Sequence, residues 1–363
     1  MLPQRQDDYL DRGYFRSAHT IRQTRFLFLK QQLWSTVWSR VPLQTYTLKK
    51  RQRKLDRSVR SRFQVRVERY QPSRAQDELY AIYQASHPLE VAKSLPEVLG
   101  QHNPTHRFQT YSLQVYDGDR LAAFSCFDLG DETLASIFGC YHPDYTRDSL
   151  GSFTMLGELD FGRQQGLTYY HPGYCVPGVA AFDYKLRLPD LEGKTFVTDH
   201  WLPMEQVLAK ALPHQTITEH IQLASQQLVG AGVPHRRVQM PLCEMMDEIA
   251  DGYGPFNLPL MLELTATNPL GEVYIAYDPA LDEYQLWYGQ PVGDLRFEPG
   301  FEGLVAEVAP EANLKFYQWR SLVARAHEFT HLLPLTRGRQ LLRTILDNLP
   351  LWAIAGSTSE EEE

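Results

Sequence analysis

The sequence predicts a mixed α/β protein with a β-sheet core, a basic module before the core and a further α+β domain after it. Three observations predict this: the order helix, three strands, helix, strand between about residues 75 and 171, a basic first segment, and mixed helical and hairpin patterns beyond residue 200. With 363 residues and 43% apolar composition the chain can bury a sizeable core. We expect the basic module at 1–69, the core at 70–195, the C-terminal domain at 196–355 and a tail at 356–363.

The first segment is strongly basic, although the whole chain is acidic. Residues 1–69 hold 17 Lys or Arg against 5 Asp or Glu, a net charge of +12, whereas the remainder holds 19 against 39, a net charge of −20. The basic residues are densest in "RVPLQTYTLKKRQRKLDRSVRSRFQVRVER". Such a block points to a polyanionic partner such as a nucleic acid, because neutralised phosphates release counterions. The alternatives are a solvated basic helix or a surface that docks on the acidic remainder.

The predicted core begins with a helix and a meander of strands. "RAQDELYAIYQASH" has helical spacing that places Leu79, Ile82 and Tyr83 on one side. The stretch 111–143 predicts three strands joined at Asp117-Gly118 and at 129–132. An Asp-Gly pair between alternating runs is the strongest short-range hairpin signal, so we expect an antiparallel meander.

A second helix and a fourth strand follow the meander. In "DSLGSFTMLGELDFGRQQG", Asp148 or Ser149 can cap the helix, Gly166 can end it, and Phe153, Leu156 and Leu159 recur at helical spacing. "LTYYH" then predicts a strand. This order of elements is similar to that of a GNAT-type acyltransferase core, in which a splayed sheet binds the activated acyl donor beside the second helix.

The region beyond residue 200 predicts a different mixture of helices and strands. "LPMEQVLAKAL" and "ITEHIQLASQQLVGAG" are typical of helices, "EVYIAYDPALDEYQLWYG" predicts a hairpin, and the stretch 316–354 is mostly helical in pattern. The final "GSTSEEEE" predicts a disordered acidic tail.

Ser149-Leu150-Gly151-Ser152 is a candidate binding site because it opens the second helix after a strand. The first N–H groups of a helix are unpaired and attract anions, and Gly151 lets a ligand approach closely. The alternative is an ordinary N-cap.

The stretch "YYHPGYCVPGVAAFDYK", residues 169–185, is the second candidate site. Tyr174, Asp183, Tyr184 and Lys185 supply phenols, a carboxylate and an ammonium suited to proton transfer or to holding a charged substrate. His171 adds a group that titrates near neutral pH. The alternative is a buried aromatic turn.

Metal, disulfide and membrane roles find little support in the sequence. His327-Glu328-Phe-Thr-His331 is a literal HExxH that on a helix would hold zinc, but Pro334 interrupts the helix and no further histidine follows, so we expect no metal. The four cysteines at 126, 140, 175 and 243 are too scattered for a disulfide framework and predict buried or reduced thiols. No apolar run is long enough to cross a membrane, so we expect a cytoplasmic protein without a membrane partner.

Together these motifs resemble the aminoacyl-tRNA–protein transferases, the arginyl- and leucyltransferases that add an amino acid from charged tRNA to a protein's N-terminus. The resemblance runs from about Tyr9 to about Glu192 and rests on "LDRGYFRS", on "RVPL" before the basic helix, on "YHPDYTRDSLGSF" and on "YYHPGYCVPGVAAFDYKLRLPDLE". It implies a GNAT-like fold, aminoacyl-tRNA as co-substrate without a further cofactor, a protein α-amine as acceptor and an N-degron type of modification. It implies catalytic roles for Tyr174, Tyr184 and Lys185, and substrate binding by Ser149, Leu150, Gly151, Ser152, Gly173, His171, Arg12, Gly13 and Arg40.

Two departures from the family pattern keep other functions open. The region before "RVPL" lacks the family's cysteine cluster, and Val179, Ala181 and Phe182 replace a Cys-x-Lys-Met run. The alternatives are an acyltransferase that uses acyl-CoA, and a non-catalytic binding protein on the same fold.

Overall fold

The computed structural model of the chain divides into two compact units, residues 1–24 with 36–210 and residues 25–35 with 211–363. Each unit is described by itself. The residues that the structure describes are 3–29, 32–86, 92–100, 108–198, 200–230, 232–239, 246–247, 258–264, 272–294 and 325–335. The predicted acidic tail and Cys243 lie outside these ranges.

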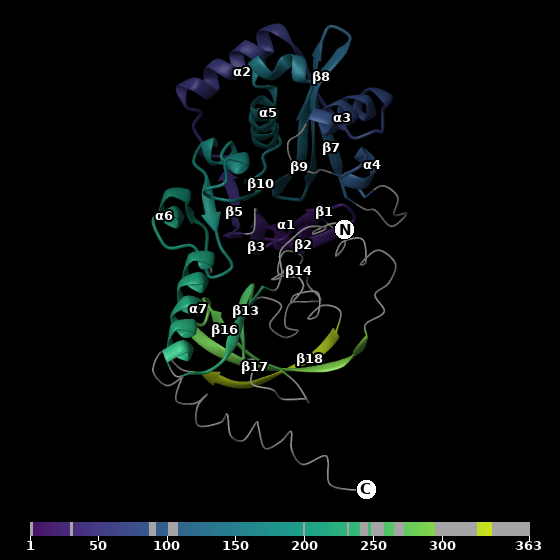
Figure 1. Ribbon diagram of the computed structural model, residues 1–363. Helices are drawn as coiled ribbons and strands as arrows, with labels where there is room; N and C mark the ends of the chain where they lie inside the picture. The colour runs from purple at the N-terminus through teal and green to yellow at the C-terminus, as the bar shows by residue number, and fades with distance from the viewer. Residues whose placement is uncertain are drawn as a thin grey trace. The chain divides into compact units, whose positions relative to one another are not determined.

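The first unit is built on an eight-stranded sheet (Figure 1). All neighbouring strands in it are antiparallel except β9 and β10, which are parallel. The strands in spatial order are β12 (Leu202–Pro203), β11 (Glu192–Lys194), β5 (Val37–Pro42), β10 (Tyr169–Cys175), β9 (Thr133–Tyr141), β8 (Arg120–Leu129), β7 (Thr110–Asp117) and β6 (Gln64–Arg69).

This sheet confirms the predicted mixed α/β class and the predicted meander. β7, β8 and β9 pair consecutively, and Gly118 in the first turn has the positive φ of 61° that an Asp-Gly turn provides. Residues 1–69, which the charge distribution predicts to be a separate basic module, contribute β5 and β6 to the same sheet. Its strands therefore belong to the same compact unit as the predicted core.

Helices cover both faces of the sheet (Figure 1). α3 (Arg74–Ser86) and α4 (Leu95–Val98) pack on one face, where Leu79 and Tyr80 meet Phe124. α5 (Leu150–Gln164) packs on the other, and α2 (Lys50–Arg62) packs on α5. Ile82, expected on the buried side of α3, is 40% exposed, because the buried stripe runs through Gln76, Leu79 and Tyr80.

α5 matches the predicted helix except at its cap. Phe153, Leu156 and Leu159 are buried, and Gly166 follows the helix with φ 77°. Ser149 occupies the N-cap position in the left-handed region, with φ 54°, and its side chain makes no capping hydrogen bond. The Asp148 carboxylate accepts a hydrogen bond from Arg62 at 2.8 Å instead. The predicted side-chain cap is therefore wrong, because an extended N-cap geometry is not adopted there.

The sheet splays between its two parallel strands. β9 and β10 pair only through residues 133–135 and 169–171. An irregularity between Tyr170 and Gly173 then turns β10, which continues against β5 with Tyr174 opposite Trp38. The rest of β9 has no pairing with β10, as the similarity to a splayed acyltransferase sheet predicts.

The remaining elements of the first unit are short. They are α1 (Pro3–Asp11), β1 (Phe15–Ser17), β2 (Thr20–Gln23), α6 (Met204–Leu208) and the 3-10 turns Pro143–Asp148, Ala180–Phe182 and Lys185–Arg187.

The second unit combines a helix with an antiparallel sheet. In α7 (Pro213–Gly230), Ile217 and Ile221 are buried, and the helix packs on β15 and β16. The sheet order is β13 (His235–Gln239), β15 (Leu260–Leu264), β16 (Glu272–Asp278), β17 (Glu283–Asp294) and β18 (Arg325–Leu335); the unit also holds β3 (Phe26–Leu29), β4 (Gln32–Ser35) and β14 (Met246–Asp247).

The second unit confirms some predictions and corrects one. The helix predicted near 217 and the hairpin of β16 and β17 are present in this unit. The helix predicted near 204 is present as α6 of the first unit. Within the stretch 316–354, expected to be mostly helical, residues 325–335 instead form β18 against β17, so the expectation is wrong there. The rest of that stretch lies outside the described residues. The HExxH motif therefore lies on a strand, where the helical spacing that zinc binding would require is absent. Within the described ranges, no helix has the length and apolar character needed to span a membrane.

Candidate functional site

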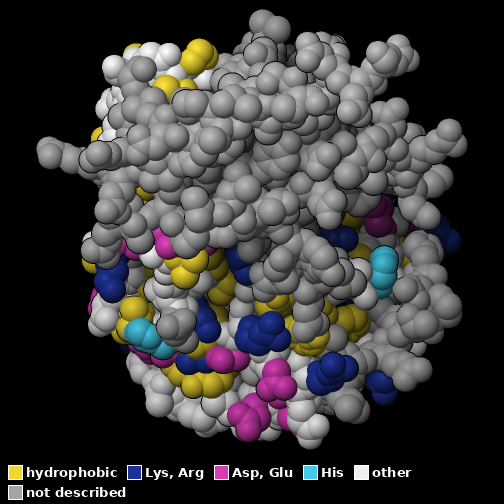
Figure 2. All heavy atoms as spheres, turned by 90° about the horizontal axis from the view of Figure 1, so that it is seen from below, with side chains coloured by type: hydrophobic (Ala, Val, Ile, Leu, Met, Phe, Trp, Pro, Cys, Tyr) yellow, Lys and Arg dark blue, Asp and Glu magenta, His cyan; other side chains and the backbone are white. Residues whose placement is uncertain are grey.

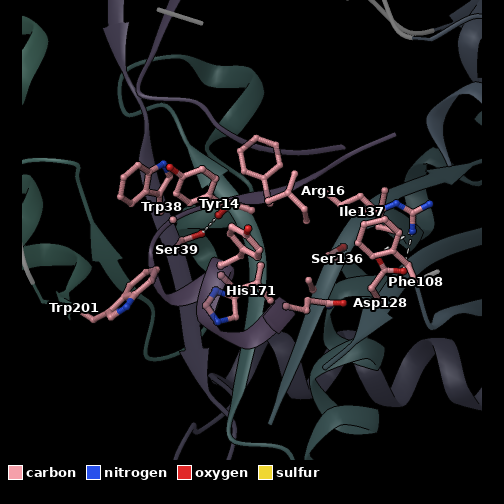
Figure 3. Close-up of a pocket in the computed structure, with 18 residues that line it drawn as sticks. Tyr14, Arg16, Trp38, Ser39, Phe108, Asp128, Ser136, Ile137, His171 and Trp201 are labelled. Carbon is pink, nitrogen blue, oxygen red and sulfur yellow. Dashed lines mark hydrogen bonds and ion pairs between the residues drawn. The ribbon is translucent and has the colours of Figure 1, made fainter. Parts of the chain in front are cut away.

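A pocket of about 550 Å³, including its open mouth, lies in the first unit where the sheet splays. Its walls come from α1, β1 and β2, from β5, and from β8, β9 and β10 on either side of the splay (Figure 3). The lining is mostly apolar, with six Phe, Tyr or Trp side chains among its eighteen residues. Its labelled members are Tyr14, Arg16, Trp38, Ser39, Phe108, Asp128, Ser136, Ile137, His171 and Trp201.

The α1 wall is held by hydrogen bonds to the turn between β8 and β9. The Asp7 carboxylate accepts from the backbone N–H groups of Asp131 and Glu132, each at 3.0 Å, and from the Thr133 hydroxyl. This contact fixes the helix that places Gln6, Tyr9 and Leu10 against the pocket.

One side of the pocket contains a buried ion pair. Arg16 and Asp128 approach to 2.9 Å with side chains 4% and 2% exposed, and Arg16 also donates to Thr110 at 3.0 Å. Thr110 donates to Asp128 at 2.6 Å, and the Arg16 guanidinium lies 4.3 Å from the centre of the Phe108 ring. Asp128 is the only carboxylate among the described pocket residues. Because it is already paired, the pocket offers no free carboxylate to a cationic ligand.

His171 lies in the pocket as a neutral ring. It is 5% exposed, and burial, with a smaller contribution from Arg40, lowers its pKa to about 3. Its ring meets Trp201 edge-on at 5.7 Å between ring centroids. At neutral pH it can therefore hydrogen-bond to a ligand without adding a charge.

Gly173 connects the pocket with Lys185. Its φ of 87° requires glycine, and Ser39 donates to its carbonyl at 2.6 Å. A Cβ at this position would lie 3.3 Å from the Lys185 ammonium nitrogen, which donates to the Tyr174 carbonyl at 3.1 Å. The ammonium is therefore in contact with a residue of the pocket wall, and burial lowers its pKa.

The two predicted catalytic phenols lie beside this lysine. The Lys185 Nζ atom is 5.6 Å from the ring centre of Tyr174 and 5.9 Å from that of Tyr184. Tyr174 stacks on Phe182 and contacts Phe15, which lines the pocket, whereas Tyr184 is 45% exposed. The structure brings Tyr174, Tyr184 and Lys185 together, next to the pocket lining but not within it.

The predicted binding residues fall into three places. Gly13, His171 and Gly173 line the pocket, and Arg12 lies outside it over the rings of Tyr9 and Tyr14. Arg40 pairs with Glu192 at 2.7 Å and with Asp11 at 3.1 Å. The group Ser149, Leu150, Gly151 and Ser152 opens α5 but does not line the pocket; Gly151 faces the ring of Tyr141 at the end of β9.

Glu158 is a buried acid that the motifs do not indicate. It is 0% exposed, and its Oε2 atom accepts a hydrogen bond from Tyr170 at 2.8 Å. Burial raises its pKa to about 7, while nearby hydroxyls and Lys185 act to lower it. A signal was available in the sequence: Glu158 follows Leu150 and Thr154 at four-residue steps, so it interrupts a buried helical stripe with a charge.

The described cysteines and acids give no metal site. Cys126, Cys140 and Cys175 are free and buried, as expected for core thiols. Among the described residues, no group of three or more His, Cys, Asp or Glu side chains is placed to hold a metal ion.

Comparisons with known proteins point to one family. Residues 58–193 match the family model described as "Arginine-tRNA-protein transferase, C terminus". The aspartate/glutamate leucyltransferase of Ruegeria sp. (strain TM1040) is 31% identical over 124 residues, or 33% of this chain and 44% of that protein. The enzyme of the same name from Ruegeria pomeroyi is 35% identical over 121 residues, or 33% of this chain and 42% of that protein. This chain therefore spans less than half the length of these relatives.

Among solved structures, the ribosomal-protein-S18-alanine N-acetyltransferase of Escherichia coli is similar with a TM-score of 0.23 and 17% identity, covering 29% of this chain and 63% of that chain. The family match includes α5, β10 and the Tyr174–Lys185 segment. Over residues 58–193 the chain is therefore similar to the C-terminal part of the arginine-tRNA-protein transferases.

Proposed function

We propose that this chain is an aminoacyl-tRNA–protein transferase, which moves an amino acid from charged tRNA to the α-amine of a protein's N-terminal residue. The family match over residues 58–193 is the observation that carries the proposal. The pocket at the splay of the sheet, with Lys185 against its wall, supports it because an acyl group entering there would meet fixed polar groups.

The proposed reaction is an acyl transfer without a further cofactor. The neutral amine nitrogen attacks the ester carbonyl carbon, a C–N bond forms, and the bond from carbon to the ribose oxygen breaks. The ribose oxygen receives the proton that the nitrogen loses. Negative charge develops on the carbonyl oxygen, and a fixed cation such as the Lys185 ammonium stabilises such charge. Tyr174 and Tyr184 lie beside that ammonium and are the proposed phenols for proton transfer.

The donor we propose is leucine rather than arginine. The relatives' name specifies leucyl transfer to aspartate or glutamate. The pocket agrees with an apolar donor, because its lining is mostly apolar and its one described carboxylate is paired with Arg16. An arginyl group would enter without a partner, and burial of an unpaired charge is costly.

The proposed modification adds an amino acid to a protein's N-terminus, an N-degron type of modification, and takes place in the cytoplasm. The macromolecular partner is the tRNA, for which α2 offers a row of exposed cations.

The test is incubation of the full chain with separately charged leucyl-, arginyl- and other aminoacyl-tRNAs and peptides with varied N-termini, read by mass spectrometry. We expect a mass gain of one leucine on peptides that begin with Asp or Glu. Lys185→Met should lower transfer at least tenfold. Lys194→Met is the matched control, because Lys194 lies on neighbouring β11 and donates to the Asp11 carbonyl outside the pocket.

Other outcomes would identify the alternative functions. A mass gain from acetyl- or other acyl-CoA without tRNA would assign an ordinary acyltransferase. Tight tRNA binding without transfer from any donor, unchanged in Lys185→Met, would assign a binding protein and contradict the proposal.

A further inference from the structure

Two buried polar side chains of the pocket make no hydrogen bond to the protein. Gln6 on α1 and His171 on β10 (Figure 3) both line the pocket, and each is 5% exposed. Neither side chain has a hydrogen-bond partner within the part of the chain that the structure describes. Because buried amide and imidazole groups are normally hydrogen-bonded, both are suited to a ligand that enters the pocket.

Other polar groups of the pocket are already engaged. Those with a hydrogen bond or ion pair inside the first unit are Arg16, Trp38, Ser39, Asp128 and Trp201. The Ser136 hydroxyl lies beside the buried side chains of Glu158 and Tyr170. The fold therefore leaves the amide of Gln6 and the imidazole of His171 for a ligand.

Both groups are neutral and can accept a hydrogen bond. An amide oxygen is an acceptor at any pH. Burial, with a smaller contribution from Arg40, lowers the pKa of His171 to about 3, so one ring nitrogen has a free lone pair at neutral pH. Neutral acceptors suit a neutral amine, whereas a carboxylate at the same place would favour the ammonium form, which has no lone pair.

The charged groups near these two side chains have partners of their own. Arg40 and the imidazole both contact the Trp201 ring, and the Asp7 carboxylate next to Gln6 accepts from backbone N–H groups of the turn between β8 and β9. The charged residues of this region that make hydrogen bonds or ion pairs within the first unit are Asp7, Asp11, Arg40, Glu192 and Lys194. An ammonium bound between Gln6 and His171 would therefore find no free anion among the described pocket residues.

We propose that Gln6 and His171 bind the neutral α-amine of the acceptor protein's N-terminal residue in the transfer proposed above. The amine donates one N–H to the Gln6 side-chain oxygen and one to a ring nitrogen of His171. Its lone pair is then free to attack the ester carbonyl carbon. As the C–N bond forms and the bond to the ribose oxygen breaks, the proton that the nitrogen loses goes to the ribose oxygen, and neither side chain takes it. This role rests on the proposed function.

The location of His171 suits this role. His171 and Gly173 both line the pocket and are two residues apart on β10. A Cβ at Gly173 would lie 3.3 Å from the Lys185 ammonium nitrogen. An amine at His171 is therefore close to the wall where, in the proposed reaction, the ester carbonyl meets Lys185.

A primary α-amine could also come from the leucyl group of the donor. We assign the site to the acceptor amine because only the attacking nitrogen has to be neutral, and the site offers neutral acceptors without a free anion. The experiments below separate the two sources.

The direct test counts the protons released when a peptide that begins with Asp binds the full chain at pH 7, by calorimetry in buffers of different ionisation enthalpy. A free α-amine titrates near pH 7.7–8.0, so binding of its neutral form should release roughly 0.8–0.9 proton per peptide. Gln6→Glu should release far less, because its carboxylate retains the ammonium. The same peptide with an acetylated N-terminus should bind more weakly and release none. Wild-type binding without proton release, or no binding with or without uncharged tRNA, would overturn the proposal.

The kinetic test separates acceptor from donor. Gln6→Met and His171→Phe should each lower kcat/KM for the acceptor peptide roughly tenfold and leave the KM for leucyl-tRNA unchanged. His171→Gln should recover part of the loss, because its amide oxygen can accept from the amine. Gln4→Met is the matched control, since Gln4 is exposed on the same helix. A rise in the KM for leucyl-tRNA instead would assign the site to the donor's amine and contradict the proposal.

Failure of this role and failure of the proposed function give different results. If no charged tRNA supports transfer, the proposed function fails, yet proton release on peptide binding still decides whether the pocket takes a neutral amine. If leucyl transfer occurs and Gln6→Met and His171→Phe both match Gln4→Met in their peptide kinetics, the proposed function stands and the role of Gln6 and His171 is wrong. Gln6→Met decides the question alone if His171→Phe does not fold.

Discussion

Burial, rather than contact with opposite charges, fixes the protonation of two residues in the candidate site. The pKa of His171 is lowered and that of Glu158 is raised, and both shifts favour the neutral form. A buried neutral group contributes to stability only in the pH range where its unfolded counterpart is neutral as well. These two side chains should therefore give the fold a pH dependence of its own.

The acid side of this dependence can be measured with His171→Gln. The folded pKa of about 3 lies below the ordinary value of 6.5, so the histidine's contribution is present above pH 6.5 and is lost as the pH falls toward 3. Denaturant unfolding should show wild type losing up to about 5 kcal/mol relative to His171→Gln between pH 7 and pH 3. The exposed His19 gives the control, because His19→Gln should follow wild type. Parallel curves for wild type and His171→Gln would contradict the assignment.

At Gly13 both the backbone conformation and the neighbouring Trp38 ring require glycine. Its φ is 83°, and a Cβ there would fall 2.0 Å from the Trp38 ring. Gly118 also has a positive φ, of 61°, but has no atom within 4 Å of such a Cβ. Gly118→Ala should therefore cost about 1 kcal/mol from backbone strain alone. Gly13→Ala should cost about 2–4 kcal/mol because overpacking is added. Equal costs in urea unfolding would contradict this difference.

At the level of elements, the local signals in the sequence were sufficient for most of the core. The Asp117-Gly118 turn, Gly166 and the stripe of Phe153, Leu156 and Leu159 identify β7, β8 and α5, because turn chemistry and helical spacing involve residues close in the chain. The side-chain cap predicted at Asp148 or Ser149 was wrong, because the left-handed backbone of Ser149 depends on the preceding 3-10 turn. At 325–335, β18 replaces the expected helix because pairing with β17 overrides the local pattern.

The site was less predictable than the elements. The sequence identified Gly173 and Lys185, yet their contact arises from the irregularity in β10 and the turn at Lys185–Arg187. The Arg16–Asp128 pair joins residues 112 positions apart, and no periodicity encodes such a distance. The burial of Glu158 likewise depends on which strands α5 packs against. Contacts between distant segments are set by the sheet order, which the sequence pattern leaves open.

α2 is the element whose charge points most clearly to a partner. Lys50, Arg51 and Lys54 are exposed and make no ion pair within the described chain, whereas Arg60 and Arg62 pair with acids of neighbouring elements. On the face shown in Figure 2, by contrast, described basic and acidic side chains lie interspersed. The unpaired residues at the start of α2 are therefore the expected phosphate contacts.

Replacing Lys50, Arg51 and Lys54 together by Gln should weaken tRNA binding and its dependence on salt. The slope of log K against log salt should fall by roughly 2–3, because each lost phosphate contact removes about 0.7–0.9. The matched control, Arg74, Lys93 and Lys210 all to Gln, removes three exposed cations outside α2 and should leave the slope unchanged. Filter binding at several salt concentrations measures both variants, and equal slopes would exclude α2 from the interface.

At the scale of the whole molecule, one short segment links the two compact units in an unusual way. Residues 25–35 belong with 211–363, although the chain on both sides of them belongs to the first unit. β3 and β4 form a hairpin there, and Ser35 and Trp34 contact His214 at the start of α7. The hairpin is thus inserted between two stretches of the first unit's chain, but it belongs to the second unit.

The ends of this insertion meet within the first unit. The Thr36 hydroxyl donates to the Thr24 carbonyl at 2.5 Å, and Trp38 Nε1 donates to the same oxygen at 3.0 Å. Because Thr24 and Thr36 are hydrogen-bonded neighbours, a two-residue Gly-Ser link can replace residues 25–35 without pulling on the sheet. All eight strands of that sheet end before residue 210.

A chain that ends at Lys210 and carries the Gly-Ser link in place of 25–35 should therefore fold, with a single cooperative thermal transition and the far-ultraviolet signal of a mixed α/β domain. The same truncation with 25–35 retained should aggregate, because it leaves Trp34 without its contact to His214 at the start of α7. Size-exclusion chromatography and calorimetry compare the two chains, which differ only in the hairpin. An unfolded linked chain beside a folded hairpin-bearing chain would show that β3 and β4 stabilise the first unit instead of the second.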